Sequence, residues 1–158
     1  MLITSKGRYA LRLMIYIAAF GGDGAADVVG GSASAAKISL REVSERERIS
    51  LKYLEQLVRP LMAAGLLKSV RGKGGGYVLG KSATEIRAGD ILRAAEGDKS
   101  AVACEALDGA CGRSDLCSTV RFWTGLENAI DTYVDGVTLA ELAKVPELKL
   151  EIDASKFA

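Results

Sequence analysis

The chain has 158 residues, of which 49% are apolar, so it can bury the core of one domain with an extension or of two very small domains, and wholesale disorder is excluded. Its net charge of +1 hides an asymmetry: residues 1–82 carry 13 Lys and Arg against 6 Asp and Glu, whereas residues 83–158 carry 8 against 14. This division predicts a polyanion-binding face in the first half and a different role for the second half.

The N-terminal segment, residues 4–20, is predicted to be a helix that a hydroxyl side chain, Thr4 or Ser5, can cap. Two arginines interrupt its apolar run, and no apolar stretch elsewhere reaches membrane-spanning length. We therefore expect neither a secretory signal nor a membrane partner, and a cytoplasmic protein. Residues 21–36 are small and glycine-rich, which indicates a flexible loop. The apolar positions of the helix follow the helical spacing at Leu11, Met14, Ile15 and Ala18.

Two more helices are predicted after this loop. Ser39 precedes a short helix through residues 40–48, and Ile49-Ser50 opens a third helix that ends near Gly65. Pro60 lacks the N–H that would bond to Gln56, so we expect it to kink or divide the third helix. One face of the third helix is assigned to the core by its apolar spacing: Leu54, Leu57, Val58, Leu61 and Met62.

A β-hairpin with a flexible basic tip is predicted next. Two strand-like runs, LLKSVR and GYVLG, flank the glycine-rich residues 72–75. A helix, a short helix–turn–helix and a hairpin, in this order, make up a winged helix–turn–helix module. We therefore expect residues 1–82 to be a DNA-binding domain, in a fold that is mainly α with a small β-hairpin.

The same hairpin matches the phosphate-binding pattern of nucleotide-binding proteins, with Gly75, Gly80, Lys81 and Ser82 at the required spacing. A phosphate loop needs a turning backbone between its glycines and a helix directly after the Lys-Ser pair. Here bulky, β-favouring residues stand between the glycines, and no long hydrophobic helix follows. A P-loop NTPase is therefore a remote alternative. We expect no enzyme, since the chain also lacks histidine, the usual general base.

The residues that read DNA are expected on the third helix and on the wing. Lys52, Gln56 and Arg59 share one helix face by spacing; Lys and Arg can donate to guanine, and Gln can pair with adenine. Glu55 opposes phosphates but can accept from cytosine, which would penalise wrong sequences. The alternative for each of these residues is a merely solvated surface. The predicted set comprises Lys6, Arg8, Tyr9, Ser50, Lys52, Tyr53, Glu55, Gln56, Arg59, Arg71, Gly72 and Lys73.

The second half of the chain is less regular. Residues 87–96 predict a short helix, residues 98–117 are irregular, and a long helix runs from Ser118 to Asp135. Residues 137–158 are weakly patterned and are interpreted as a tail. One stripe of the long helix is apolar: Trp123, Leu126, Ile130, Tyr133 and Val134.

All three cysteines of the chain, Cys104, Cys111 and Cys117, lie in the irregular segment. An odd, clustered set argues against a disulfide framework. Thiolates bind iron–sulfur clusters readily, flexible cysteines can instead act as a thiol or disulfide switch, and structural zinc usually wants four ligands at closer spacing. The residues alone leave a cluster, a switch and zinc open.

Several strings together resemble the IscR-type (Rrf) family of bacterial transcription regulators: TSKGRYAL, ISLKYLEQLV, GLLKSVRGKGGGYVLGK, the three-cysteine loop and TLAEL. The resemblance implies a homodimer of winged helix–turn–helix subunits on a near-palindromic double-stranded DNA operator, with the long helix, residues 118–136, as the dimer interface. It implies that the three cysteines of the connecting segment, residues 83–117, hold an iron–sulfur cluster, 2Fe-2S or 4Fe-4S. It also implies that Glu55 couples the cluster state to operator choice.

Two positions depart from the extra ligands that members of this family use. The histidine that the iron–sulfur assembly regulator places three residues after its last cysteine is Val120 here, and the aspartate that the nitric-oxide sensor places in its first helix is Arg8 here. The fourth ligand stays open: a carboxylate such as Asp108 or Asp115, a partner-subunit residue, water or a small thiol. The resemblance predicts a repressor that senses iron, redox state or nitric oxide. The alternative is a cluster-free regulator of cysteine metabolism, controlled by a thiol switch or a regulatory protein partner.

Overall fold

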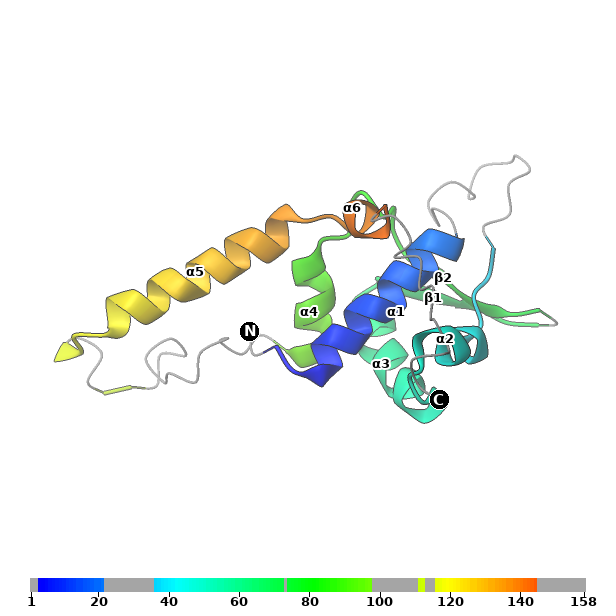
Figure 1. Cartoon of the computed structure of the whole chain (residues 1–158), viewed down its shortest axis with the longest axis horizontal. Helices are drawn as coiled ribbons and strands as arrows, with labels where there is room; N and C mark the ends of the chain where they lie inside the picture. Colours follow the sequence, from blue (N-terminus) through cyan, green and yellow to red (C-terminus); the bar gives the residue numbers. More distant parts are fainter. Residues whose placement is uncertain (1–2, 22–35, 73, 98–110, 113–115, 145–158) are drawn as a thin grey trace, which may run out of the picture.

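The computed structural model describes residues 3–21, 36–72, 74–97, 111–112 and 116–144 (Figure 1). These residues form the helices α1 (Ser5–Gly21), α2 (Leu40–Glu47), α3 (Leu51–Ala63), α4 (Ala88–Glu96), α5 (Val120–Gly136) and α6 (Leu139–Ala143), and the strands β1 (Leu67–Val70) and β2 (Gly76–Leu79). The predicted fold class, mainly α with a small hairpin, is confirmed. None of the helices in these ranges is long and apolar enough to cross a membrane.

One hydrophobic core unites α1, α2, α3 and the hairpin. The apolar face predicted for α3 is buried except for Met62, which is partly buried, and α2 adds Leu40 and Val43. The face predicted for α1 is only partly correct: Met14 is buried, whereas Leu11, Ile15 and Ala18 lie partly buried at the edge of the core. Ser39 caps α2, because its hydroxyl accepts a hydrogen bond of 3.2 Å from the Glu42 N–H. The fully buried members from α1 and α3 include Leu13, Met14, Ile17, Leu54, Leu57 and Leu61.

We expected Pro60 to kink or divide α3; the helix continues through Pro60 to Ala63, so it is not divided. Pro60 lies in the last turn, where its missing N–H removes one bond to Gln56 and leaves the buried part of the helix intact. The chain then turns at Gly65, which has a φ of 70° and follows the helix end as predicted.

The hairpin is fixed to the core at its base. β1 and β2 pair antiparallel, with Leu67 opposite Leu79. Ile38, just before α2, exchanges two backbone hydrogen bonds of 3.0 and 2.8 Å with Tyr77 of β2. Gly80 packs so closely on the Gly65 carbonyl that a Cβ at this position would collide with backbone. The hairpin therefore projects from a rigid base (Figure 1).

The second half of the chain returns to this core through α4 and α6, which both pack on α1, whereas α5 packs on α4 and extends away from the other helices (Figure 1). α6 lies in the segment that we interpreted as an unpatterned tail. Thr138 and Glu141 form a capping box at its start, with the Glu141 N–H donating to Thr138 Oγ1 at 3.1 Å. Leu139 is fully buried, so this short helix belongs to the core.

Candidate nucleic-acid interface

α3 has one buried and one exposed face. Its apolar face is locked in the core, and its first turn is capped by Ser50, whose hydroxyl accepts a hydrogen bond of 3.3 Å from the Tyr53 N–H. Because the inner face is fixed, the outer side chains can meet a ligand without any shift of the helix. The four predicted reading residues on this outer face are all exposed: Lys52, Glu55, Gln56 and Arg59.

Tyr9 and Tyr53 join the start of α1 to the start of α3. Their rings pack edge to face, with centroids 5.8 Å apart and planes at 88°. The guanidinium groups of Arg8 and Arg12 lie 6.0 and 5.7 Å from the centre of the Tyr9 ring, within range of a cation–π interaction. Two residues that were predicted from separate helices are thus brought together, with positive charge beside them.

The arginines of α1 differ in their partners. Arg12 donates to the Glu47 carboxylate and to the Glu47 carbonyl, both at 2.7 Å, and so ties α1 to the end of α2. Arg8 donates to the Ser5 hydroxyl at 3.1 Å. Sequence reasoning singled out Arg8 and Lys6 but missed Arg12, although its spacing of four residues from Arg8 places it on the same face.

An open cavity of about 380 Å³ lies between the start of α1 and the turn that joins α2 to α3. The described side chains that line it carry hydroxyl groups or a guanidinium, apart from one isoleucine, and none of these described side chains is acidic. Three of them are predicted DNA contacts, whereas Ser5 and Arg48 are not. The lining comprises Ser5, Tyr9, Arg48, Ile49, Ser50 and Tyr53.

The wing tip has the backbone that its glycines predict. Gly72 and Gly74 have φ values of 107° and 73°, which favour glycine, and the Gly75 N–H closes the turn on the Gly72 carbonyl at 2.9 Å. Arg71 and Gly72 are exposed at this tip. Lys73, the other predicted tip residue, lies outside the described residues.

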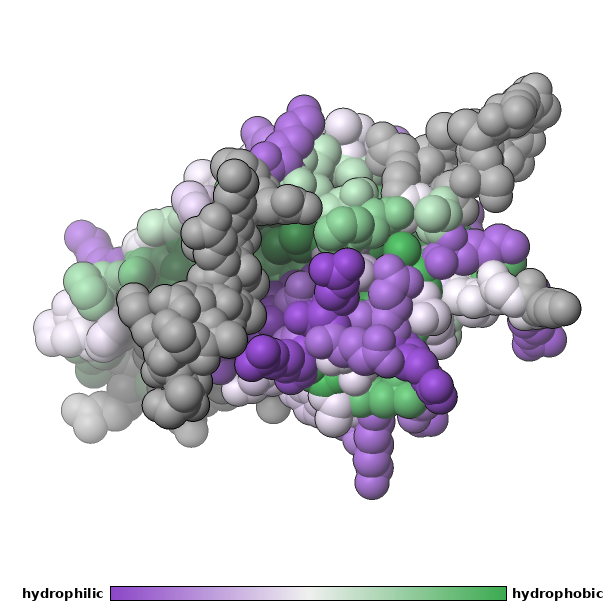
Figure 2. All heavy atoms as spheres, turned by 45° about the vertical axis from the view of Figure 1, so that its right-hand side comes forward, coloured by the Kyte–Doolittle hydropathy of each residue, from purple (hydrophilic) through white to green (hydrophobic). Residues whose placement is uncertain are grey.

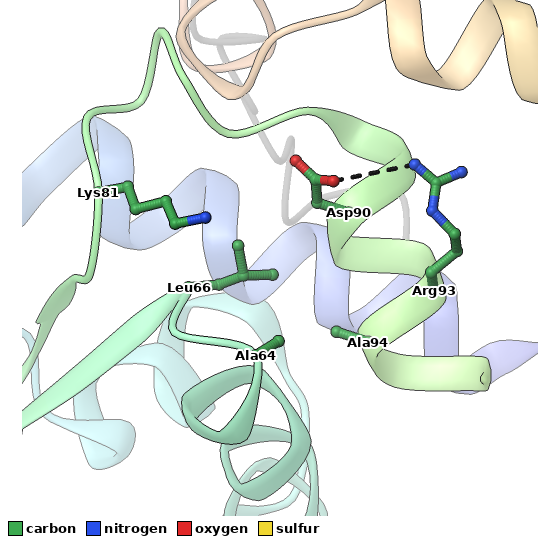
Figure 3. A pocket seen from close by; sticks show the side chains of 6 residues that line it. All are labelled: Ala64, Leu66, Lys81, Asp90, Arg93 and Ala94. Carbon is green, nitrogen blue, oxygen red and sulfur yellow. Dashed lines mark ion pairs between the residues drawn. The ribbon is translucent and has the colours of Figure 1, made fainter. Parts of the chain in front are cut away.

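The match to the phosphate-binding pattern falls on β2 and the turn after it. The residues between Gly75 and Gly80 form a strand, and α4 begins only at Ala88, so the chain lacks the helix that a phosphate loop needs directly after Lys-Ser. Lys81 lies over an open depression of about 310 Å³, in which Asp90 pairs with Arg93 (Figure 3). The NTPase alternative is wrong.

The apolar stripe predicted on α5 divides into two faces. Val134, with 7% of its surface exposed, packs against Ala88 and Leu92 of α4, and Ile130 lies partly buried at the same contact. These two residues, which we predicted for the dimer interface, hold α5 to its own chain. The sequence pattern did not predict this contact with α4, because two adjacent apolar faces of one helix give the same spacing as a single broad face.

The second face of α5 is open to solvent. Leu126 and Tyr133 are 39% and 73% exposed, and Phe122, which helical spacing places on the same line, is 64% exposed. Trp123 is partly buried and packs edge to face on Phe122, with centroids 4.8 Å apart. In Figure 2 hydrophilic residues gather over the middle and lower part of the face in view, and apolar residues lie above them and, mixed with hydrophilic ones, toward the left edge.

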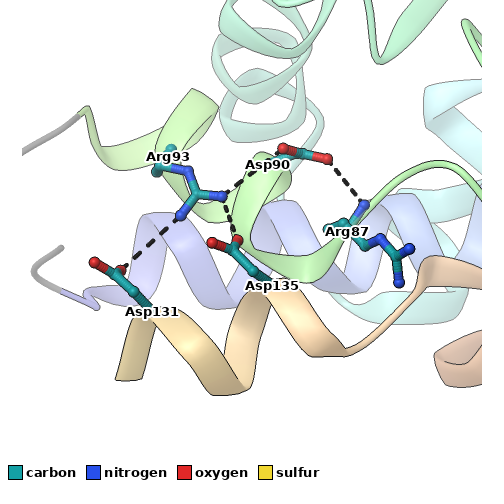
Figure 4. Close-up of polar contacts among 5 residues, drawn as sticks. All are labelled: Arg87, Asp90, Arg93, Asp131 and Asp135. Atoms are coloured by element: carbon teal, nitrogen blue, oxygen red, sulfur yellow. Dashed lines mark hydrogen bonds and ion pairs between the residues drawn. The ribbon is translucent and has the colours of Figure 1, made fainter. Parts of the chain in front are cut away.

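Arg93 clamps α5 to α4. Its guanidinium forms a hydrogen-bonded ion pair with Asp135 and lies 3.9 Å from Asp131, both on α5, and 3.8 Å from Asp90 on its own helix (Figure 4). The hydrogen bond with Asp135 raises the pKa of Arg93 above its usual value, so the clamp keeps its charge at any physiological pH.

The other end of α4 holds the start of α1. Glu96 Oε1 accepts hydrogen bonds from the Thr4 N–H and hydroxyl, both at 2.7 Å, and from the Gly7 N–H at 2.8 Å. α4 therefore touches the projecting helix α5 through Arg93 and the start of α1 through Glu96. Neither contact was predicted, because both join residues that are far apart in the sequence.

Two of the three predicted cysteine ligands, Cys111 and Cys117, are described; both are free and partly exposed, and Cys104 lies outside the described residues. The Thr119 hydroxyl hydrogen-bonds the Cys117 sulfur at 3.3 Å and, with backbone N–H groups, lowers the pKa of this thiol. A thiolate is the form that binds iron, so this pair of donors fits a cluster chemically. Within the described ranges, no three His, Cys, Asp or Glu side chains gather closely enough to hold a metal ion.

Comparison with known proteins identifies the family. Residues 3–145 match the Rrf2 family, described as an iron-dependent transcriptional regulator. The HTH-type transcriptional regulator IscR of Yersinia enterocolitica is 40% identical over 142 residues, which cover 90% of this chain and 79% of that protein. IscR of Serratia proteamaculans is 38% identical over 153 residues, covering 97% of this chain and 85% of that protein.

Solved structures agree with the sequence comparison. CymR of B. subtilis, the global cysteine regulator, has a TM-score of 0.68 at 36% identity, over 90% of this chain and 96% of that one. T. potens IscR has a TM-score of 0.65 at 30% identity, over 91% of this chain and 87% of that one. With a helix–turn–helix, a glycine-tipped wing and these relatives, the chain belongs to the Rrf2 family of DNA-binding transcriptional regulators and is not an enzyme.

Proposed function

We propose that this regulator is a repressor that binds a near-palindromic DNA operator as a homodimer and senses iron, redox state or nitric oxide through an iron–sulfur cluster. The observation that supports the DNA-binding part is the division of α3 into a largely buried inner face and a polar outer face beside a basic wing. A helix fixed in this way can enter the major groove with its side chains already aimed at base edges.

The proposed reading residues have distinct roles. Lys52 and Arg59 donate to guanine, and Gln56 pairs with adenine. Glu55 accepts from cytosine and repels misplaced phosphates, so it selects against wrong sequences. Phosphate contacts come from Lys6, Arg8, Tyr9, Ser50 and Tyr53 around the helix–turn–helix and from Arg71, Gly72 and Lys73 at the wing tip. These phosphate contacts position the protein and make its affinity depend on salt.

Cys104, Cys111 and Cys117 are the proposed cluster ligands. The relatives named IscR and the iron dependence in the family description support this assignment, as does the lowered pKa of Cys117. When bound, the cluster would supply a centre whose assembly and loss follow iron supply, oxidation or nitric oxide. Three protein thiolates with an unassigned fourth ligand would leave it labile, which suits a sensor.

The position of the cysteines offers a physical route to the DNA. They lie between α4 and α5, and α4 holds both α5, through Arg93, and the start of α1, through Glu96. A cluster bound by the cysteines between these helices would change how the two DNA-binding heads of a dimer are set relative to one another.

A second function is a cluster-free regulator of cysteine metabolism controlled by a thiol switch or a protein partner. The structural likeness to the global cysteine regulator CymR favours it, and so does the pair of free, partly exposed thiols Cys111 and Cys117. Oxidation of such thiols to a disulfide would need no iron.

The test is anaerobic purification with iron and sulfide, followed by a visible absorption spectrum and a titration of operator DNA before and after cluster removal. We expect a coloured protein whose operator affinity changes when the cluster is lost. The matched control is Cys104→Ala/Cys111→Ala/Cys117→Ala, which should be colourless and should bind the operator with the same affinity before and after the cluster-removal treatment. A triple variant that responds to iron, oxygen and nitric oxide like the wild type would overturn the cluster assignment, and a colourless wild type whose affinity follows thiol oxidation would favour the second function.

A further inference from the structure

Arg48 occupies the turn of the helix–turn–helix in a conformation that arginine disfavours. It follows α2 directly and has φ 54° and ψ 41°, the left-handed region. Among the described non-glycine residues it is alone in having a positive φ. Helix ends of this type usually carry glycine or asparagine, because other side chains strain the backbone there. A strained residue that persists is a reason to look for a function.

The Arg48 side chain is exposed and lines the cavity between α1 and the helix–turn–helix. No ion pair neutralises it within the described part of the chain, in contrast to Arg12, which pairs with Glu47. The rest of the polar lining that the structure describes consists of hydroxyl groups, so each of these polar side chains can donate a hydrogen bond and none of them carries negative charge.

We infer that this cavity holds a backbone phosphate of the operator and that Arg48 is its charged ligand; the inference rests on the DNA-binding function proposed above. A guanidinium presents paired N–H groups that match phosphate oxygens, and the hydroxyls of Ser5, Tyr9 and Ser50 supply further donors. The site lies at the start of α3, next to the side chains that read bases. A phosphate held here would fix the register of α3 in the groove without adding sequence preference.

A phosphate site would explain why a strained arginine, and not glycine, occupies position 48. Glycine would relax the turn but leave the cavity without a positive charge. Arg48→Gly should therefore separate two properties that usually change together: the isolated protein becomes more stable while its DNA affinity falls.

The experiment compares wild type, Arg48→Gly and Arg48→Lys in operator titrations at several salt concentrations, with thermal melts of the free proteins. For Arg48→Gly we expect a melting temperature about 2–4 °C higher, an affinity about tenfold lower, and a salt dependence of the affinity that is shallower by about 0.9 for each phosphate that the protein no longer neutralises. Arg48→Lys should keep the wild-type salt dependence, because it keeps the charge. Arg121→Ala, which removes one positive charge from α5, is the control for net charge and should leave the slope unchanged.

Three results would overturn or redirect the inference. If Arg48→Gly binds with wild-type affinity and slope while the wild type remains salt-sensitive, the phosphate site is wrong and the DNA-binding function stands. If the wild type itself shows no salt-sensitive binding to any DNA, the proposed function fails first. If inorganic phosphate raises the melting temperature of the wild type but not of Arg48→Gly, and the DNA slopes are equal, the site takes a free anion and not the DNA backbone.

Discussion

Glu96 is a carboxylate that adds to the cap of α1, where the hydroxyl of Thr4, one of the two predicted cap residues, accepts a hydrogen bond of 3.0 Å from the Lys6 N–H. The first N–H groups of α1 have no partner within the helix, and Glu96, at the end of α4, accepts from two of the backbone N–H groups at this end, those of Thr4 and Gly7. Partial burial alone would raise the pKa of Glu96, but the hydrogen bonds from Thr4 and Gly7 outweigh it and lower the pKa below its ordinary 4.5. The negative charge also meets the positive end of the α1 dipole.

The lowered pKa gives a test at acid pH. A carboxylate whose pKa is lower in the folded state stabilises the fold above the unfolded value of 4.5, and this stabilisation is lost as the pH falls through the folded value. We expect Glu96→Gln to lower the free energy of unfolding by about 1 kcal/mol at pH 7. The difference from wild type should shrink as the pH falls from 5 to about 3.

Urea denaturation at several pH values measures this difference. Glu45→Gln, which changes an exposed carboxylate of α2, is the matched control and should differ little from wild type at any pH. A difference between Glu96→Gln and wild type that stays constant between pH 7 and about pH 3 would mean that the charge of Glu96 does not stabilise the start of α1.

At the scale of elements, α4 connects the projecting helix α5 to α1. Its contact with α5 combines the small apolar cluster of Ala88, Leu92 and Val134 with the ion pairs of Arg93. The apolar part fixes the distance between the two helices. Arg93 pairs with Asp131 and Asp135, which lie one turn apart on α5, so the ion pairs fix the direction in which α5 runs relative to α4.

Arg93→Met tests this division of roles. Methionine keeps an apolar stem but leaves Asp131 and Asp135 without their cation. Because Arg93 and its partners are partly exposed, the free energy of unfolding should fall by only about 1 kcal/mol. Amide hydrogen exchange should become faster in residues 130–136 and stay unchanged in α3. Equal exchange of α5 in variant and wild type would show that apolar packing alone directs this helix, and Arg121→Met provides the charge control.

The sequence predicts those elements that carry their own periodic signal. α1, α3 and α5 are long enough to show an apolar face, and the two strands are bounded by glycines, so their existence follows from local pattern. α6 has five residues, too few for periodicity, and only the capping box of Thr138 and Glu141 marks it. Pro60 was expected to kink or divide α3, but it lies in the last turn of the helix, which runs undivided to Ala63 and ends there.

The sequence predicted those parts of the candidate site whose residues lie on one helix or strand. It did not predict the contacts between residues of different elements. The polar face of α3 follows from spacing within one helix. The cavity at Arg48, the cap at Glu96 and the clamp at Arg93 each need residues from two or more segments. An arginine in a turn carries no signal of its own, because its left-handed backbone is a property of the three-dimensional structure.

At the scale of the whole molecule, the basic half of the sequence forms the helix–turn–helix and wing, and the acidic half supplies α4 and α5. α5 extends from the head with an apolar line, Phe122, Leu126 and Tyr133, exposed to solvent (Figure 1). Exposed apolar side chains in a row on a projecting helix are typical of a protein interface. A second copy of the chain, paired about a twofold axis, would bury this line against itself and place two α3 helices on one DNA duplex.

Leu126→Glu should break this pairing. Burial of a leucine contributes about 2 kcal/mol, and a twofold interface repeats the loss, so we expect dimer dissociation to become about a thousandfold easier. Sedimentation of dilute protein would then show monomers, and affinity for a two-half-site operator should fall much more than affinity for a single half-site. Asn128→Glu adds the same charge to an exposed position on the other side of α5 and should sediment as the wild type does. If Leu126→Glu remains dimeric at the concentrations where wild type is dimeric, the exposed line of α5 is not the dimer interface, and the two heads must be joined by another surface.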